Sequence, residues 1–253
     1  MTVLEAVISG IVQGLTEFLP VSSSGHLVIL HKIFGLKEPQ IAFDIFLHIG
    51  TMVSVLIFFA KDIINIIVKD RKMMLLIILA CVPTFIIGFL SKDIAERLFG
   101  SSLTVGYALI ITGLWLLIAH FFAIRNKSPH GVSLLDSIII GIAQGIAVIP
   151  GISRSGATIG TGLMLGLEGS MAVKFSFLLS VPAILGASAV KFIHIEKGLE
   201  GAATVPFMAG GLAALFTGIA AIYLLLKAVK MSKLWAFGVY CILAGAVTVF
   251  LSR

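Results

Sequence analysis

Apolar blocks of up to about twenty residues recur along the whole chain, and they restrict its fold more than any other feature. Polar interruptions divide the sequence into ten blocks, near 3–19, 24–36, 41–60, 73–90, 105–124, 134–149, 155–167, 175–190, 204–226 and 235–251. A helix of roughly twenty apolar residues can cross a hydrocarbon core about 30 Å thick. The pattern predicts an all-α, multi-pass integral membrane protein.

The composition agrees with this prediction. The chain is 59% hydrophobic and 12% charged, whereas a soluble domain has about 45–50% apolar and about 25% charged residues. The net charge of +6 comes from basic residues dispersed among short loops, as expected for topology control and contact with anionic lipid. We therefore expect a membrane protein with no nucleic-acid partner.

The sequence also contains an internal repeat. The stretch GIAQGIAVIPGISRSGA at 141–157 matches GIVQGLTEFLPVSSSGH at 10–26, and seven positions are identical. The same shift carries later block boundaries of the first half close to those of the second half. This agreement predicts a single membrane domain built of two repeats, 1–130 and 131–253.

Each repeat begins with an unusual pair of blocks. At 1.5 Å per residue, block 24–36 reaches only about 20 Å, which is too short to cross comfortably. The break before it, LPVSSSG at 19–25, cannot continue a helix cleanly, because proline lacks a backbone donor and serine and glycine favour caps and turns. These features predict a re-entrant helix-loop-helix hairpin; the alternative is two ordinary tilted spans.

The hairpins have a consequence for the topology. A re-entrant hairpin does not cross the membrane, so three further spans in the first half would place the second half upside down. The expected architecture is an inverted-topology repeat of about six transmembrane helices and two hairpins. The tips PVSSSGH and PGISRSGA would then meet near the midplane.

Lysine and arginine positions predict the orientation, because cytoplasmic loops carry more of them. One face of this topology collects ten: Lys61, Lys69, Arg71, Lys72, Arg125, Lys127, Lys174, Lys227, Lys230 and Lys233. The other face collects seven: Lys32, Lys37, Lys92, Arg97, Lys191, Lys197 and Arg253. The first set is expected to be cytoplasmic, which places both termini outside.

Arg154 is the most informative residue of the second tip. A central arginine in a membrane segment costs about 2.5–3.5 kcal/mol even on the lenient insertion scale. Arg154 stands between serines and glycines at the start of a helix, where free N–H groups and the guanidinium fork suit phosphate. The arrangement indicates a diphosphate site; the alternative is an arginine neutralised by Glu17 for structural reasons only.

The two tips divide the ionisable groups between them. Glu17 lies one helical turn after Gln13, on the same helix face. Glu17 and His26 of the first tip align with apolar residues of the second, whereas Arg154 aligns with Ser23. A purely structural motif has no reason to differ in this way, so the tips are interpreted as complementary halves of one reactive site.

These residues resemble the undecaprenyl-diphosphate phosphatase family, the bacitracin-resistance type. That family carries an (E/Q)xxxE pattern followed by PVSS-x-GH, and later a PGxSRSxxT motif. This sequence supplies matching residues in all three: Gln13 and Glu17; Ser22, Ser23, Gly25 and His26; Pro150, Gly151, Ser153, Arg154, Ser155 and Thr158. FDIFLHIGT and KFSFLLSVP are also similar, so the resemblance spans the chain.

The resemblance implies removal of the terminal phosphate from a C55 polyprenyl diphosphate, with a divalent cation, to recycle the lipid carrier of cell-wall (peptidoglycan) synthesis. It also implies an enzyme of the cell (inner) membrane with a role in bacitracin resistance. Position 13 is Gln, which is the permitted alternative to a second acid. Glu17 is then the single nearby carboxylate of this tip.

We assign roles on this basis. The catalytic candidates are Glu17, His26, Arg154 and Ser23. The substrate-binding candidates are Ser22, Ser24, Gly25, Ser153, Ser155, Gly156 and Thr158. Glu17 and Gln13 are expected to hold Mg²⁺ or Ca²⁺ through oxygen atoms. The sequence leaves open whether His26, Ser23 or a water molecule attacks the phosphorus.

Other residues allow two interpretations. Asp44 and His48, one turn apart, either support the site or form a structural pair. Lys174 either attracts the anionic head group or extends to the interface. Phe175 and Phe177 are expected to face lipid or the prenyl chain.

A polyprenyl-phosphate transporter is the alternative function, because inverted repeats with broken helices are typical of secondary transporters. Such a flippase would use the same anion site without bond cleavage. The presence of Glu17 with His26 favours hydrolysis, which needs an acid and a nucleophile or base. A homodimer is one candidate for the oligomeric state.

Overall fold

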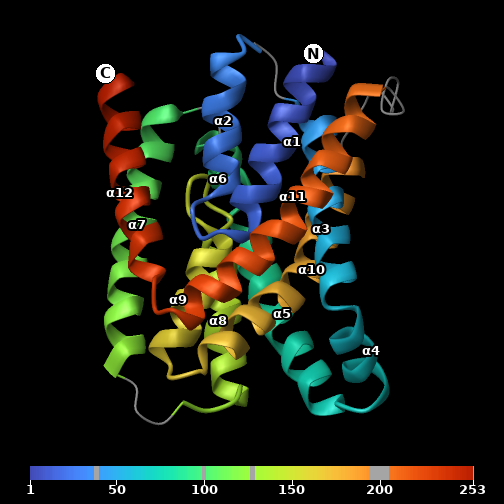
Figure 1. Cartoon of the computed structure of the whole chain (residues 1–253), viewed down its shortest axis with the longest axis vertical. Helices are drawn as coiled ribbons and strands as arrows, with labels where there is room; N and C mark the ends of the chain where they lie inside the picture. Colours follow the sequence, from blue (N-terminus) through green and yellow to red (C-terminus); the bar gives the residue numbers. More distant parts are fainter. Residues whose placement is uncertain (37–39, 99–100, 126–128, 194–204, 253) are drawn as a thin grey trace.

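The computed structural model describes the chain except for residues 37–39, 99–100, 126–128, 194–204 and 253. Its described part contains twelve α-helices (Figure 1): α1 (Val3–Phe18), α2 (Ser23–Ile33), α3 (Ile41–Phe58), α4 (Ala60–Val68), α5 (Arg71–Leu90), α6 (Lys92–Leu98), α7 (Ser102–Arg125), α8 (Leu134–Ile146), α9 (Arg154–Met164), α10 (Gly169–Ile193), α11 (Val205–Lys230) and α12 (Leu234–Leu251).

Five of the described helices are long and apolar enough to cross a membrane, namely α5, α7, α10, α11 and α12. A sixth span is formed when α3 and α4 are taken together, although their axes are bent by 70° at the break between them. The prediction of an all-α multi-pass membrane protein is confirmed. No sequence pattern indicated the bend at Phe59 or the short helix α6.

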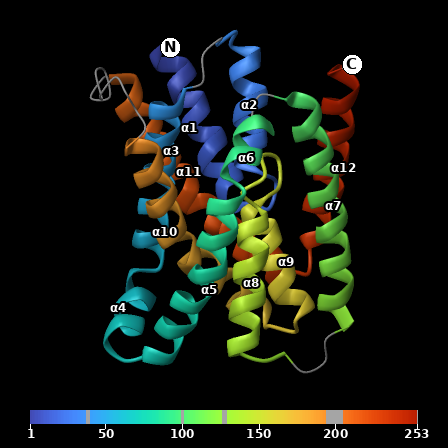
Figure 2. The ribbon, with the colours of Figure 1, turned by 180° about the vertical axis from the view of Figure 1, so that it is seen from behind.

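Two helix pairs enter the bundle from opposite ends. Figures 1 and 2 show α1 and α2 descending from one end and α8 and α9 rising from the other, with both connecting loops at mid-height. These helices have 16, 11, 13 and 11 residues, which correspond to lengths of only about 16–24 Å. The structure therefore forms the re-entrant hairpins rather than two tilted spans.

The first helix of each hairpin begins with the same local signal. Thr2 and Glu5 form a capping box on α1, in which each side chain accepts a hydrogen bond from the other residue's backbone N–H. Ser133 and Asp136 form the equivalent box on α8. Such boxes satisfy two free donors of a helix start, so α1 and α8 begin in the same way.

The hairpins are held by close packing against spans from the other half of the chain. α1 packs along α11 and α8 packs along α5, while α7 pairs with α12. Glycines allow these approaches: a Cβ atom on Gly10 would lie 2.2 Å from the Gly210 carbonyl oxygen, and one on Gly141 would lie 2.2 Å from that of Ala80. Each hairpin thus packs on a span of the other half, as two inverted repeats require. The repeat boundary at 130/131 stays a prediction.

Substitution of Gly141 by alanine is expected to destabilise the protein, although Gly→Ala in a helix normally stabilises by about 1 kcal/mol. The added methyl group would overlap backbone atoms of Ala80, and overpacking of this kind costs about 1–3 kcal/mol. Thermal unfolding in detergent measures the effect. Gly88→Ala is the matched control, because a Cβ atom there makes only an ordinary contact at 3.5 Å; equal melting temperatures of the two variants would contradict the expectation.

Aromatic side chains fill the centre of the bundle. Phe18 of α1 meets Phe177 of α10 edge to face, with ring centroids 5.1 Å apart. Phe175 and Phe177 are both fully buried, so the expectation that they face lipid or the prenyl chain is wrong. Residues two apart point to nearly opposite sides of a helix, and both are covered because α10 packs on α3, α5, α9 and α11. Lys174 instead pairs with Asp62 of α4 at 2.6 Å.

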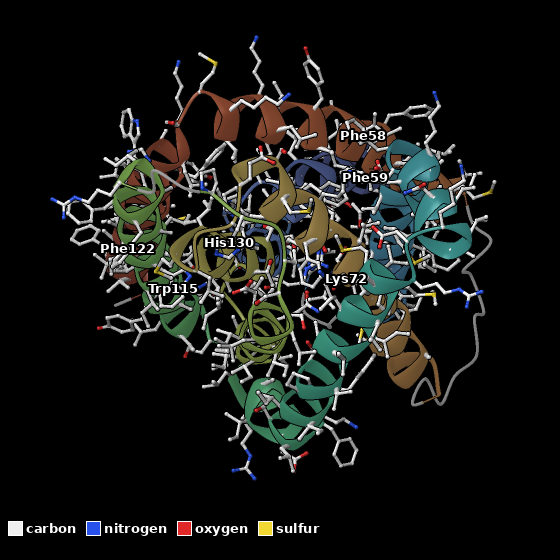
Figure 3. All side chains as sticks on the ribbon, turned by 90° about the horizontal axis from the view of Figure 1, so that it is seen from below. Phe58, Phe59, Lys72, Trp115, Phe122 and His130 are labelled. Carbon is white, nitrogen blue, oxygen red and sulfur yellow. The ribbon has the colours of Figure 1, made fainter. Side chains whose placement is uncertain are left out.

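The loop before α8 is fixed by His130. Its Nδ1 lies 2.8 Å from the Gly131 carbonyl oxygen and its Nε2 lies 3.0 Å from that of Leu165. Because carbonyl oxygens only accept hydrogen bonds, both ring nitrogens must donate, which favours the imidazolium. Figure 3 shows His130 inside the ring of helices at this end, with Phe122 at its outer edge.

These contacts make a pH-dependent contribution to stability. The carbonyl groups of Gly131 and Leu165, with the Asp136 carboxylate, raise the pKa of His130. Stability from a raised histidine pKa is present in full below the unfolded value of about 6.5 and is lost as the pH rises through the folded value. Melting curves should show His130→Gln less stable than wild type at pH 5.5, with the difference fading at alkaline pH. A difference that does not change with pH would contradict this account.

Candidate active site

The two hairpin tips present helix N-termini of matching construction. Ser22 caps α2 by accepting a hydrogen bond from the Gly25 N–H, and Ser153 caps α9 by accepting one from the Gly156 N–H. The remaining free N–H groups of a helix start, with its positive dipole end, suit an anion. The structure therefore contains the two N-termini that the repeated motif predicts.

The two tips touch each other. The Gly151 N–H donates to the Ser24 hydroxyl at 3.4 Å, and the Ser155 hydroxyl donates to the Leu19 carbonyl oxygen at 3.2 Å. Gly151 has φ of +90° and would place a Cβ atom within 2.9 Å of Val105. A glycine is therefore needed where the second tip passes α7. The two hydrogen bonds between the tips confirm the prediction that the tips lie together.

Glu17 and Arg154 form the charged centre of the site. Arg154 Nη2 donates to Glu17 Oε1 at 2.8 Å, across 137 positions of sequence. The Glu17 side chain is 5% exposed and that of Arg154 is 18% exposed. Since a desolvated ion pair roughly breaks even in stability, this arrangement agrees with a functional reason for the pair.

Arg154 keeps one group free for a ligand. Its Nη1 is buried and has no hydrogen-bond partner, although buried donors are nearly always paired in folded proteins. The guanidinium can thus contact Glu17 through Nη2 and an anion through Nη1. A phosphate oxygen is the partner that the fork geometry fits best.

The Ser23 hydroxyl contacts the Glu17 carboxylate. Its Oγ donates to Glu17 Oε2 at 2.5 Å. Ser23 is the first residue of α2, so this hydroxyl stands at the helix N-terminus where an anion would bind. A nucleophile within hydrogen-bond reach of a base is the usual signature of nucleophilic catalysis, and Ser23 with Glu17 has this geometry.

His26 is held differently. Its Nδ1 lies 2.8 Å from the Ser22 carbonyl oxygen and its Nε2 lies 2.7 Å from the Tyr240 hydroxyl. Both ring nitrogens are therefore engaged, and neither offers a free lone pair to phosphorus. Among the open candidates for the attacking group, the geometry favours Ser23 over His26.

The other predicted binding residues take two positions. Ser22, Ser24, Gly25, Ser153, Ser155 and Gly156 belong to the two touching tips. Thr158 instead hydrogen bonds to the Arg154 carbonyl oxygen at 2.9 Å and to the Ser176 hydroxyl on α10 at 2.5 Å. Thr158 thus fixes α9 against α10, and we keep its contact with substrate as a prediction only.

Three residues near the site were not assigned to it from sequence. His48 Nε2 lies 3.8 Å from Glu17 Oε2, which fits the supporting role that the sequence left open. Thr112 accepts a hydrogen bond from the Ser153 N–H at 3.1 Å. Tyr240 reaches His26 across 214 positions. No sequence signal indicated Thr112 or Tyr240, because each lies in an apolar span.

Glu17 and Gln13, the residues expected to hold a cation, offer only some of the oxygen ligands that such an ion requires. Gln13 donates its amide N–H to Glu17 Oε2 at 3.0 Å, and Gln13 Oε1 is buried without a partner. A carboxylate has about four acceptor positions, of which Arg154, Ser23 and Gln13 use three. In the described part of the chain, no group of three or more His, Cys, Asp or Glu side chains could hold a metal ion.

The fold and the site together define a class: a polytopic α-helical membrane protein whose charged site is buried where two half-membrane hairpins meet. Residues 6–247 match the family model described as bacitracin resistance protein BacA. The chain belongs to this family, and the resemblance seen in its motifs is confirmed.

Curated relatives extend over the full chain. An undecaprenyl-diphosphatase of Carboxydothermus hydrogenoformans is 46% identical over 255 residues, covering 99% of this chain and 98% of the relative. An undecaprenyl-diphosphatase of Halothermothrix orenii is 40% identical, covering 100% and 99%. An undecaprenyl-diphosphatase of Methanosphaera stadtmanae is 39% identical, with the same coverage. The similarity thus includes both hairpins and every span.

Proposed function

We propose that this protein is a membrane phosphatase that hydrolyses undecaprenyl diphosphate to the monophosphate and inorganic phosphate, and so recycles the lipid carrier of cell-wall synthesis. Its family and the names of its relatives support this activity. The observation that carries the mechanism is a single cluster in which Arg154 and Ser23 both contact Glu17 while Arg154 Nη1 has no partner.

In the proposed first step, Arg154 Nη1 and the N–H groups of the two tips bind the diphosphate. Ser23 Oγ attacks the terminal phosphorus and its proton passes to Glu17. The Ser23 O–P bond forms as the anhydride P–O bond breaks, and polyprenyl monophosphate leaves. Catalysis of phosphoryl transfer depends mainly on positioning and charge stabilisation, which the guanidinium and the helix N-termini supply.

In the second step, a water molecule attacks the phosphoserine. The bond from phosphorus to Ser23 Oγ breaks, inorganic phosphate leaves, and the serine hydroxyl regains a proton. Glu17 Oε2 lies 2.5 Å from this oxygen, so Glu17 can return to Ser23 the proton that it accepted in the first step, and both protons of the water leave with the phosphate. The site is then ready for another substrate.

A divalent cation, Mg²⁺ or Ca²⁺, remains part of this proposal. Glu17 and Gln13 Oε1 are the protein oxygens that would hold it, together with phosphate oxygens and water. When bound, such an ion neutralises charge on the diphosphate oxygens. Because the described residues offer so few ligands, the cation is expected to bind with the lipid rather than before it.

We also propose a location in the cell (inner) membrane with both termini extracytoplasmic. The start of α1 and the end of α12 lie at the same end of the molecule (Figure 1). The opposite end contains α4 and the α11–α12 connection, which belong to the more basic set of loops. All residues of the cluster come from one chain, so a homodimer would not be needed to complete the site.

The decisive experiment measures phosphate release. Purified protein in detergent, with polyprenyl diphosphate and Mg²⁺, should release inorganic phosphate, and Arg154→Ala should not. Acid quenching during turnover of a labelled terminal phosphate should trap phosphoserine, which survives acid, whereas phosphohistidine does not. No phosphate release, with movement of the lipid across liposome membranes, would replace the phosphatase by the transporter.

A further inference from the structure

Tyr240 and His26 form a pair that the mechanism above leaves unexplained. Tyr240 lies on α12 and His26 lies three residues after Ser23 on α2. Their rings stack nearly parallel, with an interplanar angle of 11° and centroids 5.8 Å apart. The 2.7 Å contact between His26 Nε2 and the Tyr240 hydroxyl ties α2 to a span of the other half.

The partners of the imidazole define its proton positions. Nδ1 faces the Ser22 carbonyl oxygen at 2.8 Å, and a carbonyl oxygen can only accept, so Nδ1 carries the hydrogen. In a neutral imidazole the other nitrogen is an acceptor. In that tautomer His26 Nε2 accepts a hydrogen bond from the Tyr240 hydroxyl, so Tyr240 satisfies the nitrogen that the Ser22 carbonyl leaves unprotonated.

The carbonyl held by His26 belongs to an unusual residue. Ser22 has φ of +68°, in the left-handed region that a residue other than glycine rarely adopts. Its carbonyl oxygen also accepts the first backbone hydrogen bond of α2, from the His26 N–H at 3.2 Å. The hydrogen bond from the His26 ring thus stabilises the turn that immediately precedes Ser23.

The second hairpin serves as an internal comparison. α9 has the same length as α2 and the same kind of serine cap, but its Ser153 has an ordinary φ of −76°. At the shift of the repeat, His26 corresponds to Ala157 and Tyr240 corresponds to Leu109. The unusual backbone and the imidazole are therefore confined to the hairpin that carries Ser23 and Glu17, and the phenol on α12 that contacts this hairpin has no counterpart at the matching position of α7.

We propose that Tyr240 is a positioning residue of the phosphatase. Its hydroxyl donates to His26 Nε2 and so keeps the ring in place, and His26 Nδ1 donates to the Ser22 carbonyl oxygen. These two hydrogen bonds in series keep the Ser23 hydroxyl on Glu17. The role rests on the proposed function, because it matters only if Ser23 is the attacking group. Tyr240 needs no contact with the diphosphate to act in this way.

Tyr240→Phe removes the hydroxyl and keeps the stacked ring. We expect kcat to fall about fivefold, the order of magnitude of one net hydrogen bond, with KM unchanged within about twofold because the anion-binding groups stay in place. Tyr223→Phe, at an exposed position on α11, is the matched control and should match wild type. An unchanged kcat in Tyr240→Phe would overturn the proposal.

Two further measurements separate positioning from general stabilisation. In a His26→Gln background, adding Tyr240→Phe should change kcat less than about twofold, because Tyr240 acts only through its hydrogen bond to His26. A further fivefold loss of kcat in the double variant would overturn the proposal. ¹⁵N NMR of labelled histidine at neutral pH should show His26 with a protonated Nδ1 and a hydrogen-bonded, unprotonated Nε2. Tyr240→Phe should shift the Nε2 signal towards that of a free lone pair.

These results also separate the proposal from the proposed function. Wild-type protein that releases no phosphate from polyprenyl diphosphate would refute the function, and the NMR spectrum would then decide the His26–Tyr240 pairing by itself. A wild-type spectrum with a protonated Nε2 would overturn the pairing in an active enzyme as well.

Discussion

Arg154→Lys is expected to lower kcat by about 10³-fold or more while the protein still folds. Lysine keeps the positive charge but loses the planar fork. In the structure Arg154 uses Nη2 for Glu17 and leaves Nη1 free, and a single ammonium group cannot place donors in both directions in the same way. An arginine that stabilises the transition state of phosphoryl transfer contributes about 10³–10⁵ in rate.

Phosphate release from polyprenyl diphosphate checks this expectation, and melting curves verify that the variant is folded. Arg125→Lys is the matched control, because Arg125 at the end of α7 stacks on Phe121 with 3.9 Å to the ring centroid. Its kcat should stay within about twofold of wild type. Turnover of Arg154→Lys near that level would show that Arg154 does not clamp the diphosphate.

Glu17→Gln should abolish most of the activity, with a loss of about 10²–10⁴, the range for removal of a general base. The amide keeps the shape of the side chain but cannot take the proton of Ser23, whose hydroxyl lies 2.5 Å away. It also leaves the buried Arg154 without a countercharge, which costs about 3–5 kcal/mol, so the melting temperature should fall as well.

Single-turnover kinetics with acid quenching test the role of Glu17 directly. Wild type should form phosphoserine within one turnover, whereas Glu17→Gln should form it about as slowly as its steady-state rate. Glu168→Gln is the control, because Glu168 is exposed and contacts Ser170 away from the tips. Rapid phosphoserine formation in folded Glu17→Gln would exclude Glu17 as the base for the attack.

Much of the site could be predicted because its motifs are local. Gln13 and Glu17 are four residues apart on one helix, and the structure joins them by a 3.0 Å hydrogen bond. Arg154 was expected beside Glu17 because the two tips divide the ionisable groups of one site between them, and the repeat indicated that the tips meet. The helix boundaries follow from caps such as Ser22 and Ser153, which short-range sequence specifies.

Other features could not be predicted because they depend on which helix faces which. Phe175 and Phe177 are buried, and Phe177 meets Phe18 of the first hairpin, yet an apolar side chain in a membrane span looks the same in the sequence whether it faces lipid or protein. Tyr240 lies in an otherwise apolar span, and its partner His26 is 214 positions away. Thr158 matched the family motif, but its hydroxyl turned to Ser176 of α10.

The membrane class, the two broken hairpins and the family could all be predicted from the sequence, because hydrophobic length, proline and glycine breaks and contiguous motifs are properties of short segments. The tertiary structure alone decided which groups of the two tips contact each other: Ser23 on Glu17, a free Nη1 on Arg154, and His26 turned to Tyr240. The physical reason is that hydrogen bonds require partners within about 3 Å, and only the packing of α1 on α11 and α8 on α5 brings such distant residues that close.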